Sequence, residues 1–151
     1  MTTTLKAQLR SDLTTAIKGR DELRSATLRM ALAAITTEEV AGKVARELSD
    51  DEVLKVLGRE VKKRKEAAEA FAGAGRAEQA AREEAEGDVL TAYLPAQLSD
   101  AELQALVDAA VAETGAEGPR AMGSVMKVLT PRVAGRADGS RVAAAVKSKL
   151  S

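Results

Sequence analysis

The stretch "LSDDEVLKVL", residues 48–57, decides the fold class because it carries a complete signal for the start of a helix. Ser49 and Glu52 have the spacing of a capping box, in which each side chain accepts a hydrogen bond from the other residue's backbone amide. Apolar residues then recur at the spacing of one helical face. They are Val53, Leu54, Leu57 and Val61. The stretch predicts a helix that begins after Ser49 and continues towards Phe71.

Helical spacing also precedes this stretch. A leucine or isoleucine recurs at every fourth position from Leu5 to Ile17, after which Gly19 offers a stop. Asp21 is placed to cap a second helix. The apolar residues of that helix are Leu28, Leu32 and Ile35. Two helices are therefore expected before residue 48.

Helical spacing resumes after a break at Gly73 and Gly75. A charged helix then leads to a short apolar group. Its members are Val89, Leu90 and Tyr93. Because no segment shows the period-two alternation of a β-strand, the sequence predicts an all-α protein.

The segment "YLPAQLSDAEL", residues 93–103, is the best candidate for a boundary between subdomains. Pro95 disfavours a helical conformation at Leu94. Ser99 and Glu102 then repeat the spacing of a capping box and restart a helix. We therefore expect the chain to change from one subdomain to another near Pro95.

The boundary divides the chain into two helical parts. Residues 1–95 are expected to form a helical N-terminal subdomain, and residues 96–151 a small subdomain of three short helices. The first of these three helices has a buried stripe that ends near Gly115. The stripe consists of Leu103, Leu106, Val107, Ala110 and Val111. Pro119 is favoured in the first turn of the next helix.

The composition excludes several kinds of functional site. The 151 residues include no cysteine, histidine or tryptophan, and only one phenylalanine and one tyrosine. Disulfides, thiol nucleophiles, typical zinc sites and a histidine base are therefore excluded. We expect no catalytic site, no metal site and no cofactor. No apolar run is long enough for a membrane span and the N-terminus lacks a signal-peptide pattern, so a cytoplasmic protein without membrane contact is predicted.

The basic run "GREVKKRKE", residues 58–66, lies on the third expected helix. Val61 continues the apolar stripe, and the polar side of the helix carries most of the charges. These charges are Arg59, Lys62, Lys63 and Glu66. The run is typical of a solvated helical face, and phosphate binding is the alternative interpretation.

The C-terminal stretch "MGSVMKVLTPRVAGRADGSRV", residues 122–142, suggests two further helices. The first has one apolar face, which includes both methionines and is expected in the core. That face consists of Met122, Val125, Met126 and Leu129. Pro131 should stop or kink this helix at Thr130. Asp138 is suited to cap the last helix, whose buried stripe is Val142, Val146 and Leu150.

Charge is unevenly distributed towards the C-terminus. Residues 118–151 contain seven basic residues and one acidic residue, Asp138. An excess of this sign is typical of an anion-binding face, although it also fits the solvated side of helices. The candidate contacts with a phosphate backbone are Lys127, Arg132, Gly135, Arg136 and Lys147.

Three segments resemble the YqeY-like family, and the resemblance extends over essentially the whole chain. They are "LSDDEVLKVLGREVKKRKEAAEAF", "YLPAQLSDAEL" and "MGSVMKVLTPRVAGRADGSRVAAAVKSKL". The C-terminal part is similar to the tail domain of GatB, a subunit of the tRNA-dependent amidotransferase. In that enzyme the tail is a small helical domain implicated in holding the tRNA. The glycine-basic-Ala-Asp signature of the family falls on residues 135–138, and its Met-Gly helix start falls on Met122 and Gly123.

The resemblance implies a non-catalytic protein that binds tRNA or has another accessory role in translation. Neither the kinase-like part nor the amidase part of the amidotransferase can be recognised in the chain. One alternative is a helical adaptor that binds a protein partner in translation. Another is an amidotransferase-related component, with carbon-nitrogen ligase chemistry and glutamine as amido donor, that acts only with a partner.

Overall fold

The computed structural model describes residues 3–151, and its regular elements are all helices. The α-helices are α1 (Leu5–Lys18), α2 (Glu22–Glu39), α3 (Asp50–Gly73), α4 (Ala77–Thr91), α5 (Asp100–Thr114), α6 (Met122–Val133) and α7 (Gly139–Leu150). A short 3-10 helix, η1 (Pro119–Ala121), precedes α6. The predicted all-α fold class is confirmed. No helix in the described part of the chain is long and apolar enough to cross a membrane.

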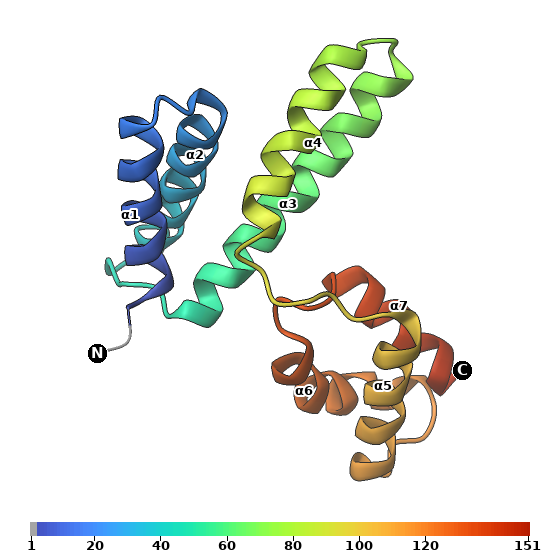
Figure 1. The fold of residues 1–151 in the computed structure, drawn as a ribbon. Coiled ribbons are helices and arrows are strands. Elements are labelled where there is room, and N and C mark those ends of the chain that lie inside the picture. Colours follow the sequence, from blue (N-terminus) through green and yellow to red (C-terminus); the bar gives the residue numbers. More distant parts are fainter. Residues whose placement is uncertain (1–2) are drawn as a thin grey trace. The chain divides into compact units, whose positions relative to one another are not determined.

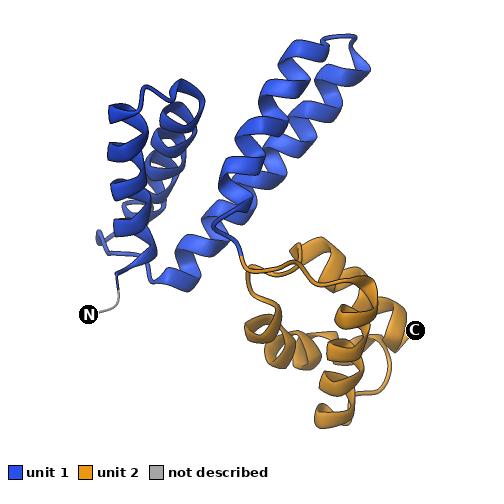
Figure 2. Cartoon of the chain, viewed as in Figure 1, with its two compact units in different colours: residues 1–94 blue, residues 95–151 orange. Residues whose placement is uncertain are grey.

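Backbone contacts divide the chain into two compact units, shown in different colours in Figure 2. Unit 1 ends at Leu94, and unit 2 comprises Pro95–Ser151. Each unit has its own cluster of buried apolar side chains. The two units are therefore described separately.

Unit 1 contains two helical hairpins, α1 with α2 and α3 with α4 (Figure 1). Helix α2 contacts both α3 and α4, so it joins the two hairpins. The core is aliphatic, as the composition requires. Its buried members are Leu9, Leu28, Ala31, Ile35, Leu48, Val53, Val56, Leu57, Val89 and Leu90.

The predicted start of α3 is confirmed. Glu52 donates its backbone N–H to Ser49 Oγ at 3.3 Å, and Ser49 donates its backbone N–H to Glu52 Oε1 at 3.2 Å. The other carboxylate oxygen of Glu52 lies 2.6 Å from the guanidinium of Arg46. The hydrogen bond from Arg46 is the main reason that the pKa of Glu52 falls from 4.5 to about 2. The cap also satisfies amides that the first helical turn leaves without partners.

The apolar series of α1 leaves the core before the helix ends. Leu9 is fully buried, whereas Ile17 is 47% exposed and Ala16 is 3% exposed. A residue four positions on is rotated by about 40° along a helix of 3.6 residues per turn. Two such steps, from Leu9 to Ile17, carry Ile17 away from the core, whereas Ala16, seven residues after Leu9, stays on nearly the same face.

Unit 2 packs α5, α6 and α7 around a second aliphatic core. The predicted capping box of Ser99 and Glu102 starts α5. Met122 and Met126 are partly buried and pack against this core. Its buried members are Leu98, Leu103, Val107, Ala110, Val125, Leu129, Val133, Val142, Val146 and Leu150.

Pro131 does not stop α6 at Thr130, which was one of the two predicted effects of this proline. Helix α6 continues through Pro131 to Val133, which is only 4% exposed. Proline has a φ angle suited to a helix and removes one backbone hydrogen bond. Burial of Val133 in the core of unit 2 compensates for that loss, because apolar burial stabilises the last turn.

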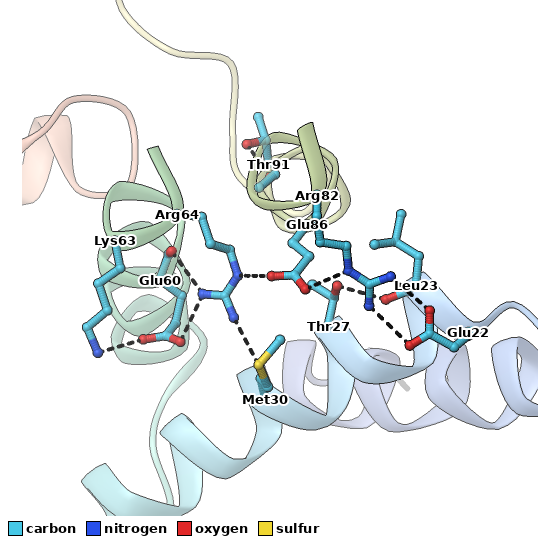
Figure 3. A network of polar contacts seen from close by, with 11 residues as sticks. Glu22, Leu23, Thr27, Met30, Glu60, Lys63, Arg64, Arg82, Glu86 and Thr91 are labelled. Atoms are coloured by element: carbon cyan, nitrogen blue, oxygen red, sulfur yellow. Dashed lines mark hydrogen bonds and ion pairs between the residues drawn. The ribbon is translucent and has the colours of Figure 1, made fainter. Parts of the chain in front are cut away.

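A network of charged side chains lies inside unit 1 and joins α2, α3 and α4 (Figure 3). Arg64 of α3 is at its centre, with a side chain that is only 7% exposed. Its Nη1 lies 3.2 Å from Glu60 Oε1 and its Nε lies 3.4 Å from Glu86 Oε2. The Nη2 of Arg64 donates to Met30 Sδ of α2 at 3.5 Å. Arg64 therefore contacts its own helix and both neighbouring helices.

The network continues from Glu86 to the surface. Arg82 donates from Nε to Glu86 Oε1 at 3.1 Å, and its two terminal nitrogens bind both carboxylate oxygens of Glu22 at 2.8 and 3.1 Å. The pKa of Arg82 is raised, chiefly by the hydrogen bonds that it donates to Glu22 and then to Glu86. The fork also holds the start of α2 against α4. The network joins residues far apart in the chain and was not predicted from the sequence.

Replacing Arg64 should strongly destabilise unit 1. Arg64→Ala would leave the carboxylates of Glu60 and Glu86 buried without their central cation, so we expect the free energy of unfolding to fall by about 3–5 kcal/mol. Chemical denaturation measures this. Lys63→Ala is the matched control, because Lys63 also pairs with Glu60 but is 73% exposed; its cost should stay below about 1 kcal/mol. Equal costs for the two variants would contradict the account.

Acid should selectively weaken the start of α3. The folded-state pKa of Glu52 is depressed to about 2, so its stabilising contribution is present above pH 4.5 and is lost as the pH falls towards 2. Wild type should be more stable than Glu52→Gln at pH 6, and the difference should disappear towards pH 2. Denaturation of both proteins across this range measures the difference. In an Arg46→Gln background the pH-dependent difference should shrink, and an unchanged difference would refute the role of Arg46.

Candidate nucleic-acid interface

The five predicted phosphate contacts lie on three elements of unit 2. Lys127 and Arg132 are on α6, and Lys147 is in the last turn of α7. Gly135 and Arg136 are in the connection between these helices. Both lysines and Arg132 are exposed, whereas Gly135 and Arg136 are partly buried.

The connection between α6 and α7 is tied to the segment that precedes α5. Gln97 donates from Nε2 to the carbonyl of Gly135 at 2.9 Å, and the Leu98 amide donates to the carbonyl of Arg136 at 2.8 Å. Gly135 has a φ of 72°, a left-handed conformation that suits glycine. The backbone of Gly135 and Arg136 therefore has a structural role, because it connects the α6–α7 loop to the segment before α5.

Asp138 caps α7, as predicted. It has the extended conformation of an N-cap, and its Oδ1 accepts a hydrogen bond from the Ser140 amide at 3.1 Å. A carboxylate at this helix start competes with any other anion for the same amides. The side chains of the neighbouring cations are therefore better candidates for phosphate contacts than the backbone.

Helix α5 supplies acidic partners for several cations of α6 and α7. Each pair joins an acid of α5 to a cation near the start or end of another helix. The pairs are Arg132 with Glu113 at 2.6 Å, Arg141 with Asp100 at 2.7 Å and Lys149 with Asp108 at 3.2 Å. All three pairs are at least partly exposed, so each contributes little to stability.

Two carboxylates of α5 have lowered pKa values. The pKa of Glu102 is lowered first by its hydrogen bonds with Ser99, and the positive charge of Arg136 contributes further. The pKa of Asp108 is lowered first by the hydrogen bond from Gln104 and then by the one from Lys149. Arg136 and Lys149 are thus both within the electrostatic influence of α5.

Unit 2 as a whole is almost neutral. Its side chains comprise seven basic and six acidic residues, because five acids in residues 95–117 offset the basic segment that follows. The charge excess of residues 118–151 is therefore largely balanced within the unit. Among the predicted contacts, the side chains of Lys127, Arg136 and Lys147 form no ion pair within residues 3–151, and of these three the two lysines are exposed.

The ion pairs that join α5 to α6 and α7 were not predicted from the sequence. Asp100 and Asp108 are separated by eight residues, and so are their partners Arg141 and Lys149. This shared interval is a signal, but it becomes useful only once α5 and α7 are known to lie side by side. Within residues 3–151 no three residues of the metal-ligating types are grouped to hold an ion.

Comparison with known proteins gives a family match over nearly the whole chain. A family model described as Yqey-like protein matches residues 6–150. An uncharacterized protein of Schizosaccharomyces pombe is 35% identical over 97 residues, which are 64% of this chain and 76% of that protein.

Substitution at Gly135 should reveal the structural role of the connection. Gly135→Ala forces a side chain into the left-handed region, which costs about 1–2 kcal/mol. Gly139→Ala is the control, since no atom outside its helix lies within 4 Å of the added Cβ; it should be neutral or stabilising by up to about 1 kcal/mol. Thermal unfolding compares the two. A neutral Gly135→Ala variant would show that the connection is not held as described.

Proposed function

The chain belongs to the YqeY-like family, and from this we propose that it is a non-catalytic accessory protein of translation that binds tRNA through unit 2. The resemblance of the C-terminal part, residues 96–151, to the tail domain of GatB supports this proposal, because that tail is implicated in holding tRNA. The proposal concerns binding alone. The amido-transfer chemistry of the larger enzyme belongs to parts that this chain does not resemble.

The observation that carries the proposal is the pair of uncompensated lysines. Lys127 and Lys147 project from α6 and α7, are exposed, and form no ion pair within residues 3–151. Cations in this state can neutralise phosphates without first losing a partner. Each phosphate that they neutralise releases condensed counterions, which drives binding at low salt.

Arg132 can contact a further phosphate if it leaves its ion pair with Glu113. Its pair with Glu113 is surface-exposed, with the two side chains 39% and 52% exposed. Such a pair is worth at most about 1 kcal/mol, so a phosphate can replace the carboxylate. The arginine fork would then bind the phosphate through two hydrogen bonds. Arg136 is held near Glu102 and is the less accessible of the two arginines.

Contacts of this kind position a nucleic acid but do not read its bases. Selectivity for tRNA would therefore come from its shape, which decides whether phosphates reach both lysines together. Folded RNA is commonly recognised through shape and backbone contacts.

The test is the binding of purified tRNA to wild type and to Lys127→Gln/Lys147→Gln, measured by fluorescence anisotropy over a range of salt concentrations. Loss of two phosphate contacts should reduce the slope of log K against log[salt] by about 2. Lys18→Gln/Lys43→Gln is the control, because it removes the same charge from exposed sites of unit 1. Its slope should match that of wild type.

Two results would contradict the proposal. Wild type that fails to bind tRNA at low salt would exclude the function and favour the alternative of a protein-binding adaptor. An unchanged slope in the Lys127/Lys147 variant would show that unit 2 does not make the contact. Partner proteins recovered equally by wild type and by Arg132→Ala/Arg136→Ala, without RNA, would also support the adaptor.

A further inference from the structure

The densest group of cations in the protein lies on α3, outside unit 2. Residues 55–65 contain six basic residues and one acid, Glu60. The other acids of α3 are in its first turn or follow this span. The five cations with exposed side chains are here named the α3 basic face. They are Lys55, Arg59, Lys62, Lys63 and Lys65.

We propose that the α3 basic face binds the phosphate backbone of RNA without regard to base sequence. The inference goes beyond the function proposed for unit 2, because it assigns a binding surface to unit 1 and does not require a folded tRNA. It rests on the direction, pairing and spacing of the α3 charges.

The direction of the side chains separates the cations from the acid of this span. At about 100° per residue, Lys55, Arg59 and Lys62 fall within about 60° of one another. The buried residues Leu57 and Arg64 lie on the opposite side. Glu60 is also buried there, where Arg64 neutralises it. The solvent side of residues 55–65 is therefore cationic, and the exposed acids Asp51 and Glu66 lie at its two ends.

The acids around the α3 basic face do not neutralise it. Glu38 of α2 lies 3.5 Å from Arg59, with the two side chains 43% and 60% exposed. Glu60 lies 3.2 Å from Lys63 but is already shared with Arg64. Lys62 has a partner within the chain, and Lys55 and Lys65 form no ion pair within residues 3–151. Exposed pairs of this kind are weak and give way to other anions.

An ordinary solvated helix has a different pattern of charge. Such helices alternate acids and bases at spacings of three and four residues, because those pairs stabilise the helix. In α3, Asp51 with Lys55 and Lys62 with Glu66 have this spacing at the two ends of the face. Between them, Lys55 and Arg59 are four residues apart, and Arg59 and Lys62 are three apart. Like charges at these spacings destabilise a helix. The run of like charges at the centre of the face is therefore better explained by an external anion than by helix stability.

The spacing fits a nucleic-acid strand. Residues 55–65 extend over about 15 Å of helix axis. A strand of nucleic acid carries one phosphate per about 3.4 Å along its axis, so several phosphates can face this helix at once. A membrane surface fits less well, because membrane-bound helices expose an apolar side. The apolar side of α3 is buried in the core of unit 1.

The test compares two triple variants with equal loss of charge. Lys55→Gln/Arg59→Gln/Lys62→Gln removes the centre of the face and preserves helix propensity. Lys18→Gln/Arg29→Gln/Arg76→Gln removes three exposed cations elsewhere in unit 1. The probe is an unstructured oligouridylate of about 20 nucleotides, and circular dichroism with thermal melting checks that both variants fold.

The α3 variant should bind oligouridylate at least about tenfold more weakly near 0.1 M salt, and its salt slope should fall by about 2, as expected for three single-strand contacts. The control should change the affinity by less than about twofold. Unchanged binding by the α3 variant overturns the inference, and so does an equal loss in the control, which would reveal only an effect of net charge. If the α3 variant loses binding to anionic phospholipid vesicles but keeps its binding to RNA, the face binds a membrane surface and the inference is overturned.

The outcomes also separate this inference from the function proposed for unit 2. Binding of oligouridylate that depends on α3, without tRNA binding that depends on Lys127 and Lys147, supports the inference and contradicts the unit 2 proposal. If tRNA binding requires Lys127 and Lys147 but is unchanged in the α3 variant, the result supports the unit 2 proposal and contradicts this inference.

Discussion

The burial of Arg64 is the constraint on which the rest of unit 1 depends. A guanidinium that is 7% exposed needs close counter-charges, and Glu60 and Glu86 provide them from α3 and α4. Arg82 then links Glu86 to Glu22 of α2. This network fixes the rotation of α3 relative to its neighbours. Arg64 and the buried apolar residues of α3 together hold one side of the helix inward, so the remaining cations of residues 55–65 face solvent.

The ion pairs of unit 2, unlike those of Arg64, lie at the surface. Its cations are on the surface, and the acids of α5 pair with those near the helix ends. The pairs are exposed and replaceable, and they leave Lys127 and Lys147 uncompensated. Residues 118–151 are strongly basic, but the acids of residues 95–117 make unit 2 as a whole nearly neutral and leave a few cations available. The charge of residues 118–151 taken alone therefore overstated the positive charge of this unit.

The sequence predicted features that depend on neighbours along the chain. The all-α class, both capping boxes and the capping role of Asp138 follow from local spacing, and all are confirmed. Features that depend on tertiary packing were not predicted. Helix α6 continues past Pro131 because Val133 is buried, and Arg64 is buried because distant Glu86 neutralises it. The pairing of α5 with α7 likewise required knowledge of which helices are neighbours.

The central claim is that exposed cations of this helical protein bind an RNA backbone. The most direct measurement is an NMR titration of uniformly 15N-labelled protein with purified tRNA, followed by addition of salt. The account predicts amide shift changes in residues 55–65 and around Lys127 and Lys147, all reversed by salt. Changes confined to α1 and α2, or changes that persist at high salt, would contradict it.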